Sequence, residues 1–216
     1  GDLRGEYHPF EGISASLQQE LLREELLMQE PDSMAAAAAG VARDWPEARG
    51  IFVSGSKELV AWINEEEHLR LWSIDRSGNL KAAFGALCAA EASLREALRQ
   101  DGRSFARSPH LGYLTACPSH VGTTLRAEVR VHIPLLDAEE GFHACCQRLG
   151  VRVCSAHGGG DLIISNAETL GTGEAEQVNA VLRAVRTFVE LEEKLDLGEK
   201  VDLSTVASPG QAQAAQ

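Results

Sequence analysis

The chain has 216 residues, of which 44% are hydrophobic and 24% are charged, a composition typical of a folded domain and unlike that of a disordered chain. No apolar run approaches the ~20 residues that a membrane span needs, and no secretory signal pattern opens the sequence. The formal net charge of -12 argues against nucleic acid or an anionic membrane as a partner, because phosphate groups attract basic surfaces.

The cysteines indicate reduced thiols. They number five, and none stands in a Cys-x-x-Cys pair, so neither a disulfide framework nor a zinc site is expected. Together with the lack of a signal sequence, this predicts a cytoplasmic protein. Because the first residue is Gly1 rather than Met, we expect the chain to be part of a longer protein.

Positive charge is concentrated in the middle of the chain. Residues 68–155 carry eleven Arg or Lys against eight Asp or Glu, and ten of the eleven are arginine. The guanidinium group binds phosphate or carboxylate through two parallel hydrogen bonds. A small anionic ligand is therefore expected to bind in this region, while most of these arginines, such as Arg95 and Arg99, are expected only to solvate helix faces.

The first half of the chain predicts two short helices, an antiparallel meander and a long helix. Ser16 and Gln19 fit a capping box ahead of leucines at helical spacing. Segments rich in β-branched and aromatic residues follow, joined by a Ser-Gly-Ser turn. The expected helices cover residues 16–29, 35–39 and 80–101, and the expected strands cover 50–53, 58–64 and 68–74.

The second half predicts further strands and two helices. The expected strands cover residues 111–116, 125–133, 151–154 and 162–165, and the expected helices cover 137–149 and 174–196. Strands come in groups separated by helices, without the strict alternation that a parallel sheet requires. The class expected is α+β with a mainly antiparallel sheet, in one domain over residues 1–203 followed by a disordered tail over 204–216.

Three consecutive carboxylates, Glu65, Glu66 and Glu67, stand at the turn between two expected strands. Carboxylates held in a cleft can bind a guanidinium group or accept its proton, whereas an ordinary solvated turn is the alternative. Strand-like alternation would direct Glu65 and Glu67 to one face and Glu66 to the other.

A second segment with reactive composition begins at Cys117 and continues through Ser119 to a Gly-Thr-Thr turn. A thiol flanked by hydroxyl and backbone donors can be partly ionised, and a thiolate attracts a cation. Core packing of the cysteine is the alternative.

Taken in this order, the segments resemble the phosphagen kinases, the ATP:guanidino phosphotransferase family that includes creatine and arginine kinases. The resemblance covers nearly the whole chain. The matching segments are residues 44–51 (DWPEARGI), 62–70 (WINEEEHLR), 110–119 (HLGYLTACPS), 122–127 (GTTLRA) and 164–166 (ISN). The resemblance implies the α+β catalytic domain of that family and transfer of the ATP γ-phosphoryl group to a small guanidino acceptor of the arginine or creatine type. It also implies Mg²⁺ held mainly by the nucleotide.

On the acceptor side, the resemblance implies that Glu65 and Glu66 bind the guanidinium group, with Glu66 the stronger candidate for the base. Cys117 would lie against the guanidinium as a thiolate, and Ser119 would support that thiolate.

On the nucleotide side, the resemblance implies that Arg70 and Arg126 bind the ATP phosphates. The residues expected to adjoin the nucleotide after Arg126 are Ala127, Glu128, Val129 and Arg130. Arg152 and the glycines Gly158, Gly159 and Gly160 are looser counterparts of the family's mobile loop. No metal-ligand cluster, nucleic acid or membrane is implied, and a homodimer is left as an open alternative for its assembly.

Several positions depart from the family pattern. The segment 151–161 is shorter than the mobile loop and lacks its Arg-Gly motif, Ile163 stands where an acidic residue is expected, and Glu25 stands where a histidine is expected. The family's N-terminal helical domain would lie upstream of Gly1. These departures keep two alternatives open: a non-catalytic relative that binds a partner or a guanidinium, and a kinase that acts on arginine side chains of proteins.

Overall fold

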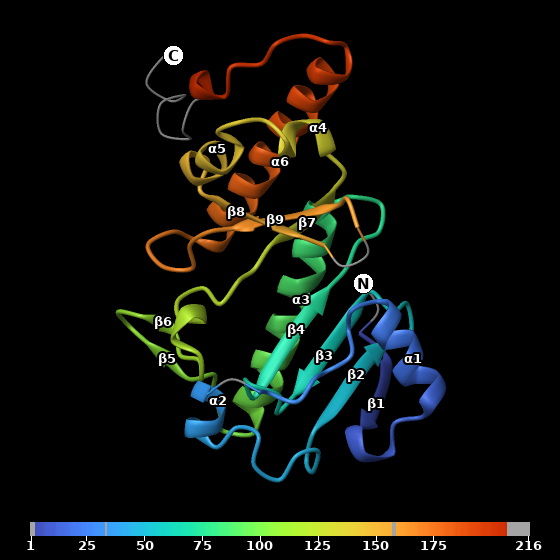
Figure 1. Cartoon of the computed structure of the whole chain (residues 1–216). Coiled ribbons are helices and arrows are strands. Elements are labelled where there is room, and N and C mark those ends of the chain that lie inside the picture. Colours follow the sequence, from blue (N-terminus) through green and yellow to red (C-terminus); the bar gives the residue numbers. More distant parts are fainter. Residues whose placement is uncertain (1–2, 33, 157–158, 207–216) are drawn as a thin grey trace. The chain divides into compact units, whose positions relative to one another are not determined.

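The computed structural model divides into two compact units, and each is described by itself. Unit 1 comprises Gly1–Ser108 and Tyr113–Ser119, and unit 2 comprises Pro109–Gly112 and His120–Gln216. Both units combine antiparallel sheets with helices, which confirms the predicted α+β class (Figure 1). The predicted tail lies outside the described residues from position 207 onward. The structure describes residues 3–32, 34–156 and 159–206.

Unit 1 is built on a four-stranded antiparallel sheet in the order β1-β2-β3-β4. The strands are β1 (Gly5–Pro9), β2 (Gly50–Ser54), β3 (Leu59–Ile63) and β4 (Leu69–Ser73). The meander β2-β3-β4 was predicted and is confirmed. Strand β1 was missed because it is an edge strand with almost every side chain exposed, so it has no hydrophobic alternation to detect.

The helices of unit 1 are α1 (Ala15–Arg23), α2 (Met34–Ala39) and α3 (Leu80–Gln100), preceded by the short η1 (Phe10–Gly12). Helix α1 ends earlier than predicted. Glu25 adopts φ 57°, and the N–H groups of Leu26 and Leu27 donate to the Leu21 carbonyl at 2.8 and 3.1 Å. The reversal buries Leu26 together with Met28 in the core beneath the sheet.

Arg49 holds the segment before β2 against the turn that follows β3. Its guanidinium donates to five backbone carbonyls, those of Val41 (2.5 Å), Arg43 (3.1 Å), Asp44 (3.3 Å), Glu47 (2.7 Å) and Asn64 (3.0 Å). The Asn64 side chain donates in return to the Ala48 carbonyl at 3.0 Å. The first residue of the acidic turn, residues 64–68, is therefore fixed from two directions.

Two short strands and a short helix lie between residues 107 and 120: β5 (Arg107–Ser108), β6 (Gly112–Tyr113) and η2 (Pro118–His120). The strand predicted over 111–116 is reduced to the two residues of β6. Gly112, the first residue of β6, adopts φ 75°, a left-handed conformation that glycine accommodates without strain.

Unit 2 contains a three-stranded antiparallel sheet in the order β7-β9-β8. The helix predicted over 137–149 begins later, at Phe142, because Gly141 adopts φ 91° as its N-cap. A separate short helix begins earlier, at Pro134. The elements are β7 (Glu128–Val131), α4 (Pro134–Asp137), α5 (Phe142–Arg148), β8 (Val151–Ser155), β9 (Leu162–Asn166), α6 (Glu174–Asp196) and η3 (Leu203–Thr205).

One face of this sheet forms the core of unit 2. Val129, Ile164 and Val153 are paired in one row across the three strands, and Ile164 is fully buried. Helix α6 contacts all three strands and contributes Phe188, which packs edge-on against Phe142 of α5 at 5.2 Å between ring centres. In the described parts of the chain, no helix is both long and apolar enough to cross a membrane.

We predict that Arg49→Ala lowers the free energy of unfolding by about 1 to 3 kcal/mol, because five backbone carbonyls lose a charged donor at once. Denaturant unfolding followed by circular dichroism measures this. The matched control is Arg43→Ala, whose side chain is 82% exposed and pairs with Asp44, and it should change stability by less than about 0.5 kcal/mol. Equal effects of the two substitutions would contradict the role assigned to Arg49.

The adjacent thiols of α5 give a second prediction. Cys145 and Cys146 are buried, and burial raises the pKa of both, that of Cys146 to about 12. A maleimide at about pH 8 should therefore modify exposed Cys88 and Cys154 while Cys145 and Cys146 react only after denaturation, as read by peptide mass spectrometry. The stability contributed by the neutral Cys146 thiol is present below pH 9 and is lost as pH rises toward about 12. Rapid labelling of native Cys146 would refute this account.

Candidate active site

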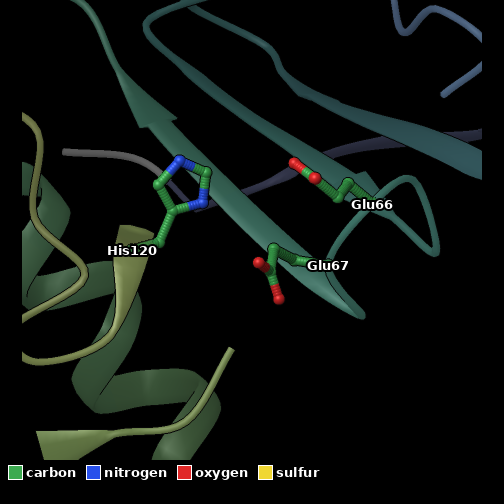
Figure 2. Close-up of side chains that lie close together, drawn as sticks. All are labelled: Glu66, Glu67 and His120. Carbon is green, nitrogen blue, oxygen red and sulfur yellow. The ribbon is translucent and has the colours of Figure 1, made fainter. Parts of the chain in front are cut away.

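The acidic turn connects β3 to β4. Its ends are closed by the pairing of Ile63 with Leu69 and by the Asn64 N–H, which donates to the His68 carbonyl at 3.1 Å. Asn64 adopts φ 59°, a left-handed conformation that asparagine tolerates better than most residues. Figure 2 shows the Glu66 and Glu67 side chains leaving this turn.

Glu65 and Glu66 face one guanidinium group, that of Arg70. The Arg70 nitrogens lie 3.8 Å from Glu65 Oε2 and 3.5 Å from Glu66 Oε2, which makes both contacts ion pairs. The three side chains are only 12%, 26% and 28% exposed, so water screens these charges incompletely. The Arg70 guanidinium also lies over the ring of Trp62 at 5.5 Å.

One oxygen of this carboxylate pair lacks a hydrogen-bond donor. Glu65 Oε2 is buried and accepts no hydrogen bond, because the Arg70 contact at 3.8 Å is too long to be one. A buried carboxylate oxygen without a donor is costly, and an incoming N–H group would satisfy it.

The expectation that Glu65 and Glu67 share a face, opposite Glu66, was wrong. Glu65 and Glu66 converge on Arg70, and Glu67 is directed elsewhere. The alternation rule fails because residues 64–68 form a bend and not a strand.

Glu67 binds the backbone of the cysteine loop, residues 115–119. Its two carboxylate oxygens accept hydrogen bonds from the N–H groups of Ala116 at 2.7 Å and Cys117 at 3.1 Å. The Thr115 hydroxyl donates to the Cys117 carbonyl at 2.7 Å. The sequence predicted no binding or catalytic role for Glu67. Its place among three consecutive carboxylates is the one sequence feature that points to it.

The sulfur of Cys117 has a hydroxyl partner within the same loop. Cys117 Sγ lies 2.9 Å from Ser119 Oγ, a hydrogen bond in which either atom could be the donor. Cys117 is partly exposed, so the alternative of a buried packing cysteine does not describe its environment. Unit 1 thus brings Glu65 and Glu66 onto one guanidinium and ties Cys117 to the same turn through Glu67.

In unit 2, a buried asparagine positions the segment that precedes β7. The Asn166 side chain accepts from the Ala127 N–H at 2.8 Å and donates to the Leu125 carbonyl at 3.0 Å. Leu125 and Ala127 are buried on either side of Arg126, whose side chain is 61% exposed. Ala127 and Val129 both face the interior, so any contact of theirs with a nucleotide would come from the backbone.

A second polar link holds the start of this segment to α6. The Thr123 hydroxyl donates to Gln177 Oε1 at 2.8 Å, and Gln177, itself buried, donates to the Thr172 hydroxyl at 3.1 Å. The Thr123 N–H also donates to the Thr169 carbonyl at 2.9 Å. The segment has no strand pairing before Glu128, and these side chains replace it.

The outer face of the β7-β9-β8 sheet carries three of the predicted nucleotide residues. Pairing places Glu128 in one row with Ser165 and Arg152, and Arg130 lies two residues further along the same face. Arg130 and Arg152 are exposed. We call Arg126, Arg130 and Arg152, together with Glu128 between them, the arginine face.

Glu128 forms an ion pair with Arg126. Glu128 Oε1 lies 2.5 Å from Arg126 Nε. Among the three predicted glycines, Gly159 and Gly160 adopt φ 94° and 83°, which a glycine accommodates without strain, and Gly158 lies outside the described residues.

Comparison with known proteins identifies the family to which these residues belong. The family model for the ATP:guanido phosphotransferase C-terminal catalytic domain matches residues 1–195. The testis creatine kinase of Oncorhynchus mykiss is 38% identical over 208 residues, which cover 94% of this chain and 54% of that protein.

Two solved structures agree in fold. A lombricine kinase structure superposes with a TM-score of 0.88 at 32% identity, covering 94% of this chain and 57% of that one. The duplicated taurocyamine kinase of Schistosoma mansoni with bound transition-state analogue components gives 0.81 at 35% identity, covering 90% of this chain and 27% of that one.

The chain belongs to the ATP:guanido phosphotransferase family and matches its catalytic domain. It spans about half the length of the curated creatine kinases that it matches. The predicted resemblance to the phosphagen kinases is thereby confirmed.

The Glu67 contacts predict a change in amide exchange. Glu67→Ala should accelerate hydrogen exchange at the Ala116 and Cys117 amides by at least about tenfold, because both lose a charged acceptor. Exchange read by mass spectrometry on fragments covering residues 114–119 measures this. The neighbouring substitution Glu66→Ala serves as control and should leave both amides protected. Unchanged exchange in Glu67→Ala would show that the carboxylate does not hold the loop.

Proposed function

We propose that this protein transfers the γ-phosphoryl group of ATP to a guanidino nitrogen of a small acceptor. Family membership supports the reaction class. The observation that carries the proposal is the carboxylate pair Glu65 and Glu66, which already binds a guanidinium, that of Arg70, and retains a buried oxygen without a donor.

The acceptor class follows from the same chemistry. Two carboxylates in a partly buried site suit a planar cation with several N–H donors better than an ammonium group. The similar proteins are named for creatine, lombricine and taurocyamine, and we propose an acceptor of this guanidino class, of the arginine or creatine type.

On the acceptor side, Glu65 would bind the guanidinium and Glu66 would act as the base. The guanidino nitrogen attacks the γ-phosphorus, an N–P bond forms, the bond from phosphorus to the bridging oxygen breaks, and Glu66 takes the proton that the nitrogen loses. Cys117, with Ser119 beside it, would place a thiolate near the cation. Glu67 would hold the cysteine loop in position against the acidic turn through its two hydrogen bonds to the loop backbone.

On the nucleotide side, the arginine face supplies fixed positive charge. Phosphoryl transfer passes through a loose transition state with charge on the equatorial oxygens, so alignment and cationic groups provide most of the rate. Arg126 and Arg130 would bind phosphate oxygens of ATP, which enters as its Mg²⁺ complex. Arg70 is a third proposed phosphate ligand and would leave Glu65 and Glu66 when the acceptor guanidinium replaces it.

Glu66→Gln tests this function. It should lower kcat by about 10²- to 10⁴-fold, because it removes the proton acceptor and keeps the shape of the side chain. The protein at its full encoded length is assayed with MgATP and arginine, creatine, lombricine or taurocyamine, with ³¹P NMR detecting the N–P product. Glu58→Gln, an exposed carboxylate of the same unit, is the matched control and should retain activity.

The outcomes separate the alternatives. Guanidine binding without product from the unsubstituted protein would contradict the enzyme proposal and support a non-catalytic relative. Phosphoarginine on protein substrates, with no small-molecule product, would support a protein-arginine kinase.

A further inference from the structure

Glu128 lies within a surface that is otherwise suited to anions. Its side chain shares the arginine face with Arg130 and Arg152 and contacts Arg126 through a 2.5 Å ion pair. Glu128 is 32% exposed, so the carboxylate is partly shielded from water, whereas Arg126 is 61% exposed. A negative charge in this position acts directly on whatever anion the arginines bind.

The backbone around Arg126 and Glu128 is fixed, so the two residues stay next to each other. The residues on both sides of Arg126, Leu125 and Ala127, are buried. The Asn166 side chain forms a hydrogen bond with the backbone of each of them. Glu128 begins β7 and is paired with Ser165. Arg126 and Glu128 therefore remain neighbours, and a ligand of Arg126 must be accommodated beside the Glu128 carboxylate.

We propose that Glu128 is an affinity-determining residue that competes with nucleotide phosphate for the Arg126 guanidinium. The inference rests on the proposed function, because it takes Arg126 as a phosphate ligand. In the absence of nucleotide, Glu128 occupies the Nε edge of Arg126. When a phosphate approaches, it displaces this carboxylate or binds the remaining edge of the guanidinium, and in either case it meets a like charge nearby.

If Glu128 only oriented Arg126, removing its charge would have the opposite effect on phosphate affinity. A carboxylate that only orients the arginine would strengthen phosphate binding, since it would hold the guanidinium in a productive rotamer. Removing the charge of Glu128 therefore distinguishes a competitor, whose loss tightens binding, from an orienting residue, whose loss weakens binding.

The test measures binding of MgADP to the full chain by isothermal titration calorimetry. Glu128→Gln preserves size and removes charge, and it should lower Kd by about threefold to tenfold at low salt, with the gain shrinking as salt increases. Glu140→Gln removes an exposed charge from the same unit and is the matched control, with Kd expected to be unchanged. In an Arg126→Gln background, Glu128→Gln should lower Kd by less than about twofold, because the guanidinium for which Glu128 and phosphate compete is absent.

Two failures are distinguishable. If Arg126→Gln weakens MgADP binding but Glu128→Gln leaves it unchanged or weakens it, Glu128 is not a competitor, although the nucleotide site itself stands. If MgADP does not bind, or if Arg126→Gln has no effect on its Kd, the phosphate role of Arg126 fails, and this inference fails with it.

Discussion

A carboxylate held against a guanidinium is the interaction on which the proposed chemistry of this protein depends. In unit 1, Glu65 and Glu66 bind the guanidinium of Arg70 in a partly buried setting. The two carboxylates gain Coulomb energy from the neighbouring cation, because water is partly excluded, but they lose hydration. They are therefore stable in this setting only while a cation lies beside them. The acceptor of the proposed reaction offers the same chemical group, and exchange of one guanidinium for another avoids leaving two carboxylates unpaired.

The backbone around this pair is held by side chains more than by strand pairing. Arg49 fixes Asn64 at the start of the acidic turn, and Glu67 at its other end binds the amides of Ala116 and Cys117. These contacts join segments that lie about fifteen and fifty residues apart in the sequence, so the geometry of the site depends on long-range hydrogen bonds.

Much of the fold could be predicted from local patterns. The meander β2-β3-β4 and the helices α3 and α6 have clear periodicity, and the structure contains them within a few residues of the predicted bounds. The exposed strand β1 and the early end of α1 could not be predicted, because one has no apolar alternation and the other depends on the left-handed Glu25.

The candidate site divides in the same way. The identities of Glu65, Glu66 and Cys117 came from motifs, because motifs record which residue types a chemistry needs. The position of Arg70 against the acidic pair depends on the bend at residues 64–68, which the expected strand alternation did not contain. Arg126 and Glu128 are two residues apart, so extended backbone places them on one face, but the ion pair between them was not predicted.

The side chains of Asn166 and Gln177 give the segment around Arg126 a property that an ordinary loop lacks. Both are buried, and their hydrogen bonds tie the segment to β9 and α6 before any ligand is present. A binding partner therefore does not have to immobilise the main chain, and the entropy lost on association falls chiefly on the exposed arginine side chains. Preorganisation of this kind favours fast capture of a multiply charged anion by groups that need only change rotamer.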